Sequence, residues 1–349
     1  MRIAIVSTPF VPVPPRCYGG TELVVHALAR GLRAAGHDVT LFATGDSRAR
    51  QVRYTFRKAV WPPRPEAEFR HCAAAARAIA SERFDVVHSH VPGMVPFARQ
   101  LPAPLVHTIH HGHEERLTRA YLRQPSVRYV AISARQAQLE PQLACDVVHH
   151  GLDPARHPLG FGEGDYALFL GRFSPCKAPD LAIAAALGAG LPIRLAGRVH
   201  EVDATPEWTA LLERALGRPG VLHVGPVGGA RKTALLGDAR ALLMPLRWEE
   251  PFGLVMIEAM LCGTPVVAFP RGAAPEIVEE GVTGYLADDV DGMSAALRRL
   301  EGFDRARCRR RARLRFGAAR MTREYERVYA QALAGALLAG GAEESSYAG

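Results

Sequence analysis

The most constraining feature of this chain is that short β-branched runs alternate with helical stretches along its length. Such alternation is typical of a parallel sheet, because parallel neighbours must be joined by a crossover that is usually a helix. In the first half, strands are predicted at Arg2–Val6, Asp38–Ala43, Asp85–His88, Leu105–Ile109, Tyr129–Ile132 and Asp146–His149. In the second half, they are predicted at Ala167–Leu170, Ile193–Ala196, Val221–Val224, Ala241–Met244, Pro265–Phe269 and Gly284–Leu286.

Helices fill the intervals between these strands. They are predicted at Thr21–Ala35 (with Thr21 as N-cap), Glu66–Ala80, Pro179–Leu187, Pro206–Leu216, Ala230–Leu236, Gly253–Leu261 and Ala274–Glu279. The pattern predicts an α/β fold made of two Rossmann-like, doubly wound parallel-sheet domains. In such open sheets ligands bind beyond the carboxyl ends of the strands, so two of these domains facing each other would form a cleft.

A segment rich in Gly and Pro separates the two halves at residues 150–165. We interpret it as a linker with a boundary near Phe161, which predicts domains 1–160 and 161–319. The segment from Asp304 to Leu338 is predicted to be long, helical and amphipathic, and the last ten residues are expected to be loosely ordered.

Composition narrows the class of protein. The formal charge is +8, but only Lys58, Lys177 and Lys232 are lysine, and aromatic residues are not interleaved with the arginines as a nucleic-acid-binding surface requires. Six scattered cysteines without a C-x-x-C pair indicate reduced thiols and a cytoplasmic location. The arginine run at 305–315 favours a solvated helix face, with peripheral contact to anionic lipid at the inner membrane face as the alternative.

Residues 248–260, WEEPFGLVMIEAM, carry the most chemical information. Pro251 suits the first turn of a helix, whose free amides at Gly253, Leu254 and Val255 would favour a phosphate. Glu258 lies further along this apolar helix, where a carboxylate suits a ribose diol. Glu250, just before the helix, could face a sugar on the same diphosphate.

Other candidates follow the ends of predicted strands. Arg172 and Lys177 lie after the strand ending at Leu170, where both could reach one diphosphate. Gly19 and Gly20 precede the first helix and allow close backbone approach. The chain has neither G-x-G-x-x-G nor a P-loop motif, which disfavours a dinucleotide-binding dehydrogenase and a P-loop kinase.

Histidines are frequent in the first half, but they follow separate strands without metal-ligand spacing, so no metal site is expected. His110 is the best candidate to donate a hydrogen bond to a sugar hydroxyl. Val224 and Gly225 expose backbone that could read a nucleotide base, and Glu276 at another helix start could touch a sugar hydroxyl.

Taken together, these residues resemble the retaining glycosyltransferases of family 4, which have the GT-B fold. The resemblance covers nearly the whole chain, and its segments are MRIAIVSTPF, YGGTE, DVVHSH, TIHHG, AISARQ, VVHHGLDP, GRFSPCKAPDLAI, EEPFGLVMIEAMLCGTPVVA, PEIVEEGVTGYL and FGAARMTREYERVY. It implies that domain 161–319 binds the donor and that domain 1–160 binds the acceptor, with a C-terminal helix at 320–338 returning to the first domain.

The resemblance also implies residue roles. Arg172 and Lys177 match the basic pair at the diphosphate, Glu258 the ribose ligand, and Glu250 and His110 groups near the transferred sugar. The implied donor site comprises Gly19, Gly20, Arg172, Lys177, Val224, Gly225, Glu250, Phe252, Gly253, Leu254, Val255 and Glu258. A UDP-sugar donor is expected, with a GDP-sugar as alternative, and no metal or other cofactor.

Departures from the family pattern occur at three places: His150 stands where Asn is frequent, Pro251 replaces a frequent Gly, and Arg271-Gly272 replaces Gly-Gly. The rival hypotheses are a sugar-nucleotide isomerase or phosphorylase of the same fold, and a non-catalytic nucleotide-sugar-binding protein. The acceptor stays open among glycans, lipid-linked glycans and small molecules, because its pocket would use variable loops such as Val11–Tyr18 and Arg116–Gln124.

Overall fold

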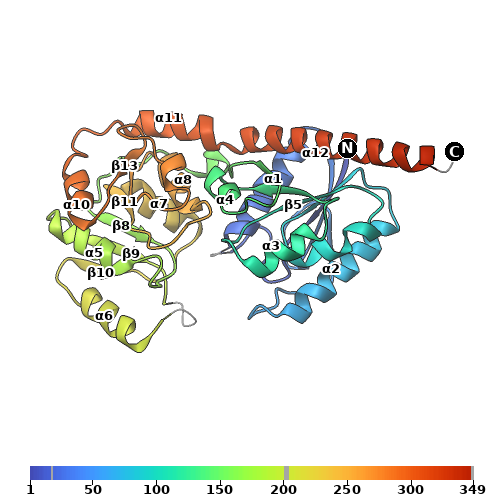
Figure 1. Cartoon of the computed structure of the whole chain (residues 1–349). Helices are drawn as coiled ribbons and strands as arrows, with labels where there is room; N and C mark the ends of the chain where they lie inside the picture. The colour runs from blue at the N-terminus through green and yellow to red at the C-terminus, as the bar shows by residue number, and fades with distance from the viewer. Residues whose placement is uncertain (17–18, 200–203, 347–349) are drawn as a thin grey trace. The chain divides into compact units, whose positions relative to one another are not determined.

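The chain folds into two compact units, each built on one parallel sheet (Figure 1). The computed structural model describes residues 1–16, 19–199 and 204–346, with side chains described as far as residue 336. Unit 1 comprises Met1–Gly151 with Ala318–Gly349, and unit 2 comprises Leu152–Gly317. The predicted boundaries lay between residues 160 and 161 and between residues 319 and 320. Cys17 and Tyr18, which belong to predicted motifs, lie outside the described residues.

Unit 1 contains a seven-stranded sheet in the order β3-β2-β1-β4-β5-β6-β7, and every strand pair in it is parallel. Its strands are β1 (Arg2–Val6), β2 (Asp38–Ala43), β3 (Val52–Tyr54), β4 (Val86–Ser89), β5 (Leu105–Thr108), β6 (Arg128–Ala131) and β7 (Cys145–Val147). Its helices are α1 (Gly20–Ala34), α2 (Pro65–Ala80), η1 (Pro92–Gln100), α3 (Glu115–Leu122), α4 (Ala134–Gln138) and α12 (Ala318–Ser346).

Unit 2 contains a six-stranded parallel sheet in the order β10-β9-β8-β11-β12-β13. Its strands are β8 (Ala167–Leu170), β9 (Ile193–Ala196), β10 (Val221–His223), β11 (Ala241–Met244), β12 (Val266–Ala268) and β13 (Gly284–Leu286). Its helices are η2 (Pro154–Arg156), α5 (Pro179–Gly188), α6 (Pro206–Leu216), α7 (Gly229–Asp238), α8 (Leu254–Leu261), α9 (Ala274–Ile277), α10 (Val290–Arg298) and α11 (Arg305–Phe316).

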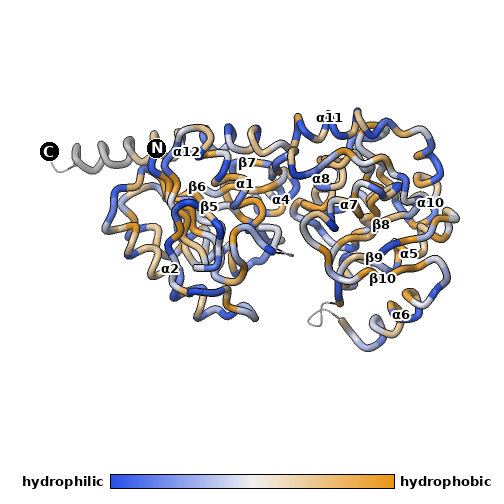
Figure 2. Tube along the Cα trace, turned by 180° about the vertical axis from the view of Figure 1, so that it is seen from behind, coloured by the Kyte–Doolittle hydropathy of each residue, from blue (hydrophilic) through white to orange (hydrophobic). Residues whose placement is uncertain are grey.

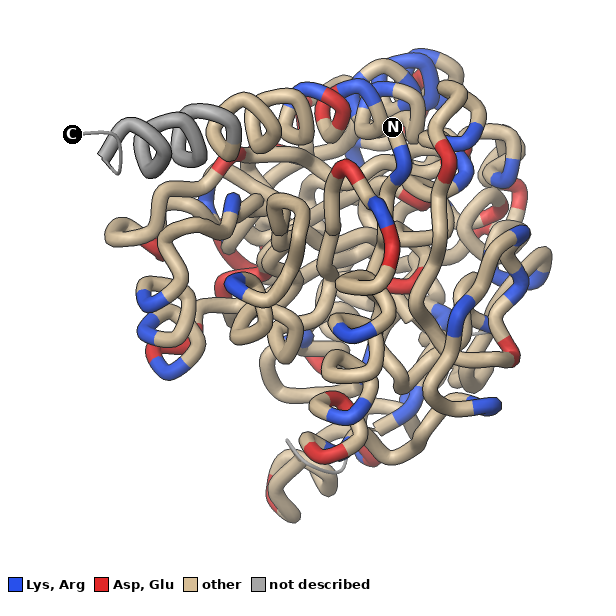
Figure 3. Tube along the Cα trace, turned by 90° about the vertical axis from the view of Figure 1, so that its right-hand side faces the viewer, with Lys and Arg blue, Asp and Glu red and all other residues tan. Residues whose placement is uncertain are grey.

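Each unit has its own hydrophobic core around its sheet. The central strands β8 and β11 of unit 2 are mostly buried, which is why they appear in the sequence as apolar runs and why β8 carries the hydrophobic colour in Figure 2. Charged residues of both signs are interspersed along the chain (Figure 3). In the part of the chain that the structure describes, no helix has the length and apolar character needed to cross a bilayer.

The predicted two-sheet α/β fold is confirmed, but two local predictions are wrong. Thr21 does not cap α1, whose N-cap is Gly19. Pro251 precedes α8 and is not in its first turn, because Gly253 caps the helix in the left-handed conformation. The segment from Asp304 to Leu338 is helical as predicted, in two helices, α11 and α12, separated at Gly317, where the backbone is extended. The helix α12 is assigned as far as Ser346, and loose order of the last ten residues stays a prediction.

Candidate functional site

The predicted site residues of unit 2 follow the carboxyl ends of its strands. Arg172 and Lys177 lie in the loop after β8, and Glu250 lies in the loop after β11. These two strands are neighbours at the centre of the sheet, where the strand order changes direction. In doubly wound sheets the connections on the two sides of such a switch point run in opposite directions, and ligands bind between them at the carboxyl ends of the strands. The topology therefore brings the predicted phosphate and sugar ligands to one edge.

The helix α8 begins directly at this edge. Its N-cap, Gly253, has φ 85°, a backbone conformation that other residues adopt only at a cost. The amides of the first helical residues, Leu254 and Val255, cannot bond within the helix and carry the positive end of its dipole. From Met256 onward every residue of α8 is buried. Burial of its body fixes α8 in place, whereas Gly253, Leu254 and Val255 at its N-terminus are partly exposed.

Lys177 and Glu250 form an ion pair. The same Oε2 of Glu250 accepts a hydrogen bond of 3.0 Å from the indole Nε1 of Trp248, and the Lys177 ammonium lies 4.8 Å from the centre of that ring. The side chains of the pair are 15% and 10% exposed, so water screens this charge only partly. Trp248 thus holds the cation and the carboxylate together beside α8.

A second lysine–glutamate pair lies inside unit 2. Lys232 of α7 pairs with Oε1 of Glu258, and Nε2 of His157 lies 4.0 Å from the same oxygen. Burial would raise the pKa of Glu258, but the Lys232 ammonium and His157 outweigh it and hold the pKa below its ordinary value. Glu258 is therefore a buried carboxylate that stays ionised at neutral pH.

Lys232 was not among the predicted site residues, but it pairs with one of them, Glu258. Its signal was present, since lysine occurs only three times in the chain and two of these lysines pair with the two glutamates of the 248–260 motif. The bond to Glu258 joins α7 to α8, and a contact between two helices is not visible in either segment alone.

The remaining predicted donor residues of unit 2 are placed as follows. Phe252 is buried, with its ring edge-on to Phe316 at 6.1 Å. Gly225, two residues after β10, has φ 74°, and its carbonyl accepts from the amide of Gly197. Val224 donates its own amide to Leu195, so its N–H is used within the sheet. Glu276 lies in the first turn of α9.

Gly19 and Gly20 lie in unit 1, at the start of α1. Gly19 has φ 155°, and a Cβ there would lie 2.8 Å from Pro15 and 2.9 Å from Oε2 of Glu22. Glu22 is buried and accepts a hydrogen bond of 2.6 Å from Thr8, and burial raises the pKa of its carboxyl. The turn requires glycine because the chain packs closely there.

The histidines of unit 1, predicted to follow separate strands, come together in space. Nδ1 of His90 lies 2.8 Å from Nε2 of His110, and the His110 ring stacks on His150 with centres 5.1 Å apart and an angle of 20°. His88 lies beside His90 with ring centres 4.1 Å apart. Burial lowers the pKa of His88 and of His110 to about 3, so these rings are neutral at physiological pH.

Among the described residues, no group of three or more His, Cys, Asp or Glu side chains is arranged to hold a metal ion. The sequence contains a D-x-D spacing at Asp289–Asp291, but the Asp289 carboxylate caps α10 by accepting from the amide of Gly292. The five cysteines in the described ranges, which are Cys72, Cys145, Cys176, Cys262 and Cys308, are free thiols.

The arginine run is only partly a solvated face. Arg305 donates to the carbonyls of Gly160, Gly237 and Ala239, and Arg309 donates to that of Pro154 at 3.0 Å. The prediction of a solvated face is wrong for these two arginines. Their hydrogen bonds hold the first segment of unit 2 against the rest of that unit. Arg307, Arg310, Arg311 and Arg313 are exposed.

Two family models match the chain. Residues 18–156 match the model described as Glycosyltransferase Family 4, and residues 164–301 match that of Glycosyl transferases group 1. The halves defined by these matches follow the two sheets.

Curated relatives and solved structures agree with these matches. A phosphatidyl-myo-inositol mannosyltransferase of Mycolicibacterium smegmatis is 32% identical over 335 residues, which cover 85% of this chain and 84% of the relative. A D-inositol 3-phosphate glycosyltransferase of Mycobacterium avium is 34% identical over 274 residues, and this chain spans only 64% of its length. A crystal structure of a glycosyltransferase involved in avilamycin A biosynthesis superposes with a TM-score of 0.76 at 27% identity, covering 96% of this chain and 98% of that one. The chain therefore belongs to glycosyltransferase family 4 and has the GT-B fold.

Proposed function

We propose that this glycosyltransferase moves a hexose from a UDP-sugar to a hydroxyl group of its acceptor, with retention at the anomeric carbon and without a divalent metal. The observation that carries the proposal is the pair of lysine–glutamate contacts beside α8. A glutamate–lysine pair at a helix N-terminus offers both signs of charge to one ligand. A nucleotide sugar needs both, because its diphosphate is anionic and its sugars carry hydroxyl donors.

The proposed donor contacts follow from these positions. Glu258 accepts hydrogen bonds from the ribose, and the amides of Leu254 and Val255 face the diphosphate. Lys177 and Arg172 neutralise the same diphosphate, and Glu250 accepts from hydroxyls of the transferred sugar. A GDP-sugar is the alternative donor, since these groups do not contact the base.

The chemistry is loss of a diphosphate from the anomeric carbon, with its bonding electrons going to the leaving oxygen. Negative charge grows on that oxygen as the sugar becomes oxocarbenium-like, so the cations bind the transition state more tightly than the ground state. The acceptor hydroxyl attacks from the same face and gives its proton to a phosphate oxygen, which explains retention without a protein nucleophile. Two basic side chains and a helix dipole supply the positive charge that a metal would otherwise bring.

The test is turnover of nucleotide sugars by the Lys177→Met and Lys177→Glu variants. Loss of the leaving-group cation is expected to lower kcat by roughly 100- to 1000-fold. The control is Lys58→Met, which removes an exposed lysine from unit 1. Wild-type rates are expected to survive EDTA. Near-normal turnover by Lys177→Glu would refute the leaving-group role.

The donor and the alternative functions are separated by two further measurements. A thermal-shift panel of UDP- and GDP-sugars identifies the donor, because a ligand that binds only the folded state raises Tm. Slow hydrolysis of the donor without acceptor distinguishes a transferase from a protein that only binds nucleotide sugars. The names of both mycobacterial relatives contain inositol, which supports an inositol-type polyol as the first acceptor to test.

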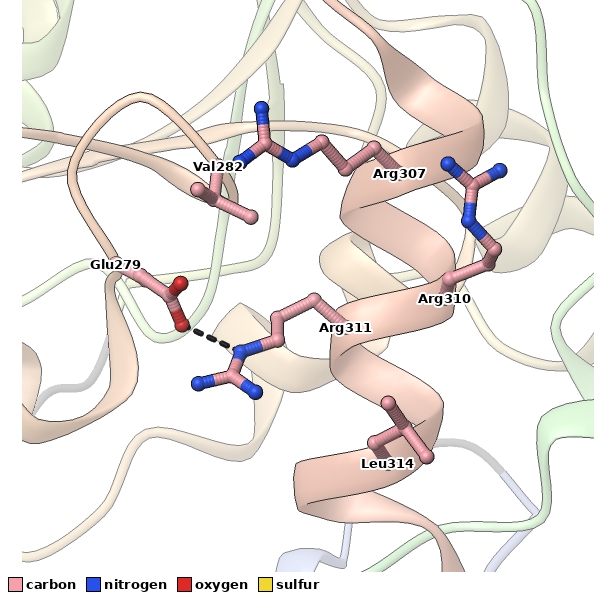
Figure 4. A pocket seen from close by; sticks show the side chains of 6 residues that line it. All are labelled: Glu279, Val282, Arg307, Arg310, Arg311 and Leu314. Atoms are coloured by element: carbon pink, nitrogen blue, oxygen red, sulfur yellow. Dashed lines mark hydrogen bonds and ion pairs between the residues drawn. The ribbon is translucent and has the colours of Figure 1, made fainter.

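We further propose that the enzyme is cytoplasmic and contacts anionic membranes peripherally. Free thiols are typical of a reducing compartment. The surface for lipid is a shallow pocket on α11 lined by Glu279, Val282, Arg307, Arg310, Arg311 and Leu314 (Figure 4). Arg311 pairs with Glu279 at 2.6 Å, and Leu314 is 71% exposed on the helix turn beyond it.

Cationic side chains next to an exposed leucine suit anionic headgroups above an apolar layer. Co-sedimentation with vesicles tests this surface. Binding to vesicles that contain phosphatidylglycerol is expected to fall in the Arg307→Gln/Arg310→Gln double variant and to persist in Arg218→Gln, an exposed arginine elsewhere in unit 2. Equal binding of both variants to the vesicles would show that the α11 surface does not bind lipid.

A further inference from the structure

The hydrogen bond between His90 and His110 contains a single proton. The two ring nitrogens, Nδ1 of His90 and Nε2 of His110, are 2.8 Å apart. Burial lowers the pKa of both imidazoles, that of His90 well below its ordinary value, so both rings are neutral at pH 7. A neutral imidazole has one N–H and one bare nitrogen. One ring must therefore donate across this contact while the other accepts.

The two possible arrangements differ at the far nitrogen of His90. If His110 donated, His90 would need a bare Nδ1 and would carry its proton on Nε2. That Nε2 is buried, and it has no hydrogen-bond partner among the residues that the structure describes. A buried N–H without an acceptor is rarer in folded proteins than an under-used acceptor. His90 as the donor avoids the orphan N–H.

We propose that His90 donates its Nδ1–H to Nε2 of His110 and thereby holds His110 as the Nδ1–H tautomer. His90 is then a positioning residue that makes His110 a hydrogen-bond donor on its other nitrogen. The functional consequence rests on the proposed function, in which His110 donates to a hydroxyl of the transferred sugar. In the opposite tautomer Nδ1 would be bare, and it could only accept from that hydroxyl.

The surrounding residues restrict the ring as well as its proton. His110 is partly exposed, and one face of its ring stacks on His150. The carbonyl of His150 accepts a hydrogen bond of 2.8 Å from Nη2 of Arg320 on α12. Stacking fixes the plane of the His110 ring. The hydrogen bond from His90 determines which of the two ring nitrogens of His110 carries the proton.

The decisive measurement is the tautomer of His110 by NMR on protein with ¹⁵N-labelled histidine. Protonated and bare ring nitrogens resonate far apart, and the His110 signals are those lost in His110→Gln. We expect a protonated Nδ1 and a bare Nε2 in the wild-type protein at pH 7.5. A wild-type His110 protonated at Nε2 would overturn the proposal without any need for a variant.

Variants then test whether His90 is the cause. His90→Asn keeps an N–H near the position of Nδ1, whereas His90→Leu removes the donor. His90→Leu is expected to shift His110 towards the Nε2–H tautomer and to lower kcat about 10- to 100-fold with little change in donor KM, and His90→Asn should restore most of both. The control His150→Asn leaves the donor in place and should not change the tautomer.

A purely structural role for His90 gives a different result: His90→Leu would lower Tm but leave the His110 tautomer unchanged, which contradicts the inference. The spectrum does not depend on transfer. A protein with the expected tautomer but without transferase activity would therefore reject the proposed function alone.

Discussion

At the scale of single residues, the rarity of lysine is a signal that the sequence offers directly. Lysine is rare in this chain, and that rarity singled out Lys177, which pairs with Glu250. The same reasoning applies to Lys232, but its segment, GARKTALLGD, shows no other chemical feature. Its importance depends on its contact with Glu258 in the following helix, α8. The burial of that carboxylate is a property of the fold.

Replacing Lys232 should therefore affect both stability and donor binding. In Lys232→Met, Glu258 loses its main compensating charge, so burial raises the pKa of the carboxyl. Leaving a buried charge unpaired typically costs about 3–5 kcal/mol of unfolding free energy. We expect a lower Tm, weaker UDP binding by calorimetry, and binding that becomes stronger as pH rises, because Glu258 must ionise to serve as an acceptor.

The matched variants are Lys58→Met, which removes an exposed lysine, and Lys232→Met/Glu258→Gln, which removes both charges. The double variant should recover part of the lost stability but not the UDP affinity. Unchanged UDP affinity in Lys232→Met at every pH would show that the pair is structural only.

At the scale of elements, the sequence predicted the strands well, with the exception of the edge strand β3, and predicted the caps of α1 and α8 poorly. Strands buried on both faces, such as β1 and β11, are marked by apolar runs, and their bounds are predicted correctly. The edge strand β3 was missed because three residues with two exposed side chains carry no such pattern. The cap of α8 was missed for another reason: Gly253 adopts a left-handed conformation that propensity does not reveal.

The loop that carries Glu250 gives a prediction at this scale. Gly272, after β12, has φ 58°, and a Cβ there would collide with the backbone of Glu250. The carbonyl of Glu250 also accepts from the amide of Ala273 at 2.9 Å. Gly272→Ala should displace the Glu250 loop and lower kcat. We expect a loss of at least about 10-fold, as for a misplaced catalytic group.

Gly281→Ala provides the control, since Gly281 has φ 68° but open space around its would-be Cβ. Both variants carry the strain of an alanine in the left-handed region, about 1 kcal/mol, and only Gly272→Ala adds the collision. If steady-state kinetics of the two variants were alike, the contact between Gly272 and Glu250 would have no part in positioning the carboxylate.

At the scale of the whole molecule, the predictable part of the site is the part that topology determines. Parallel strands deliver their following loops to one edge, so Arg172, Lys177 and Glu250 could be grouped from the sequence. The histidine contacts of unit 1 could not be predicted, because ring orientation depends on packing. His88, for example, bonds through Nδ1 to Tyr329 and through Nε2 to Thr108, and Tyr329 is 241 positions away.

The same histidines predict how the molecule responds to acid. Burial lowers the pKa of six side chains in unit 1, which are those of His71, His88, His90, His107, His110 and His150. Below pH 6.5 these histidines bind protons in the unfolded chain, whereas in the folded unit they stay neutral. The free energy of unfolding of unit 1 therefore falls as pH falls. For each fully buried histidine the loss is about 2 kcal/mol at pH 5.

Two carboxyls of unit 1 act in the opposite direction. Burial raises the pKa of Glu22 and Glu68, so each adds stability as pH falls towards 4.5.

The six histidines outweigh the two carboxyls, so unit 1 should unfold before unit 2 as the pH falls. Hydrogen exchange followed by mass spectrometry between pH 7.5 and 5, corrected for intrinsic rates, should show β4 and β5 losing protection before β8 and β11. Unit 2 contains Glu258, whose lowered pKa places its loss of stability below pH 4.5, outside this window. Earlier loss of protection in β8 and β11 would mean that the buried histidines do not control acid stability.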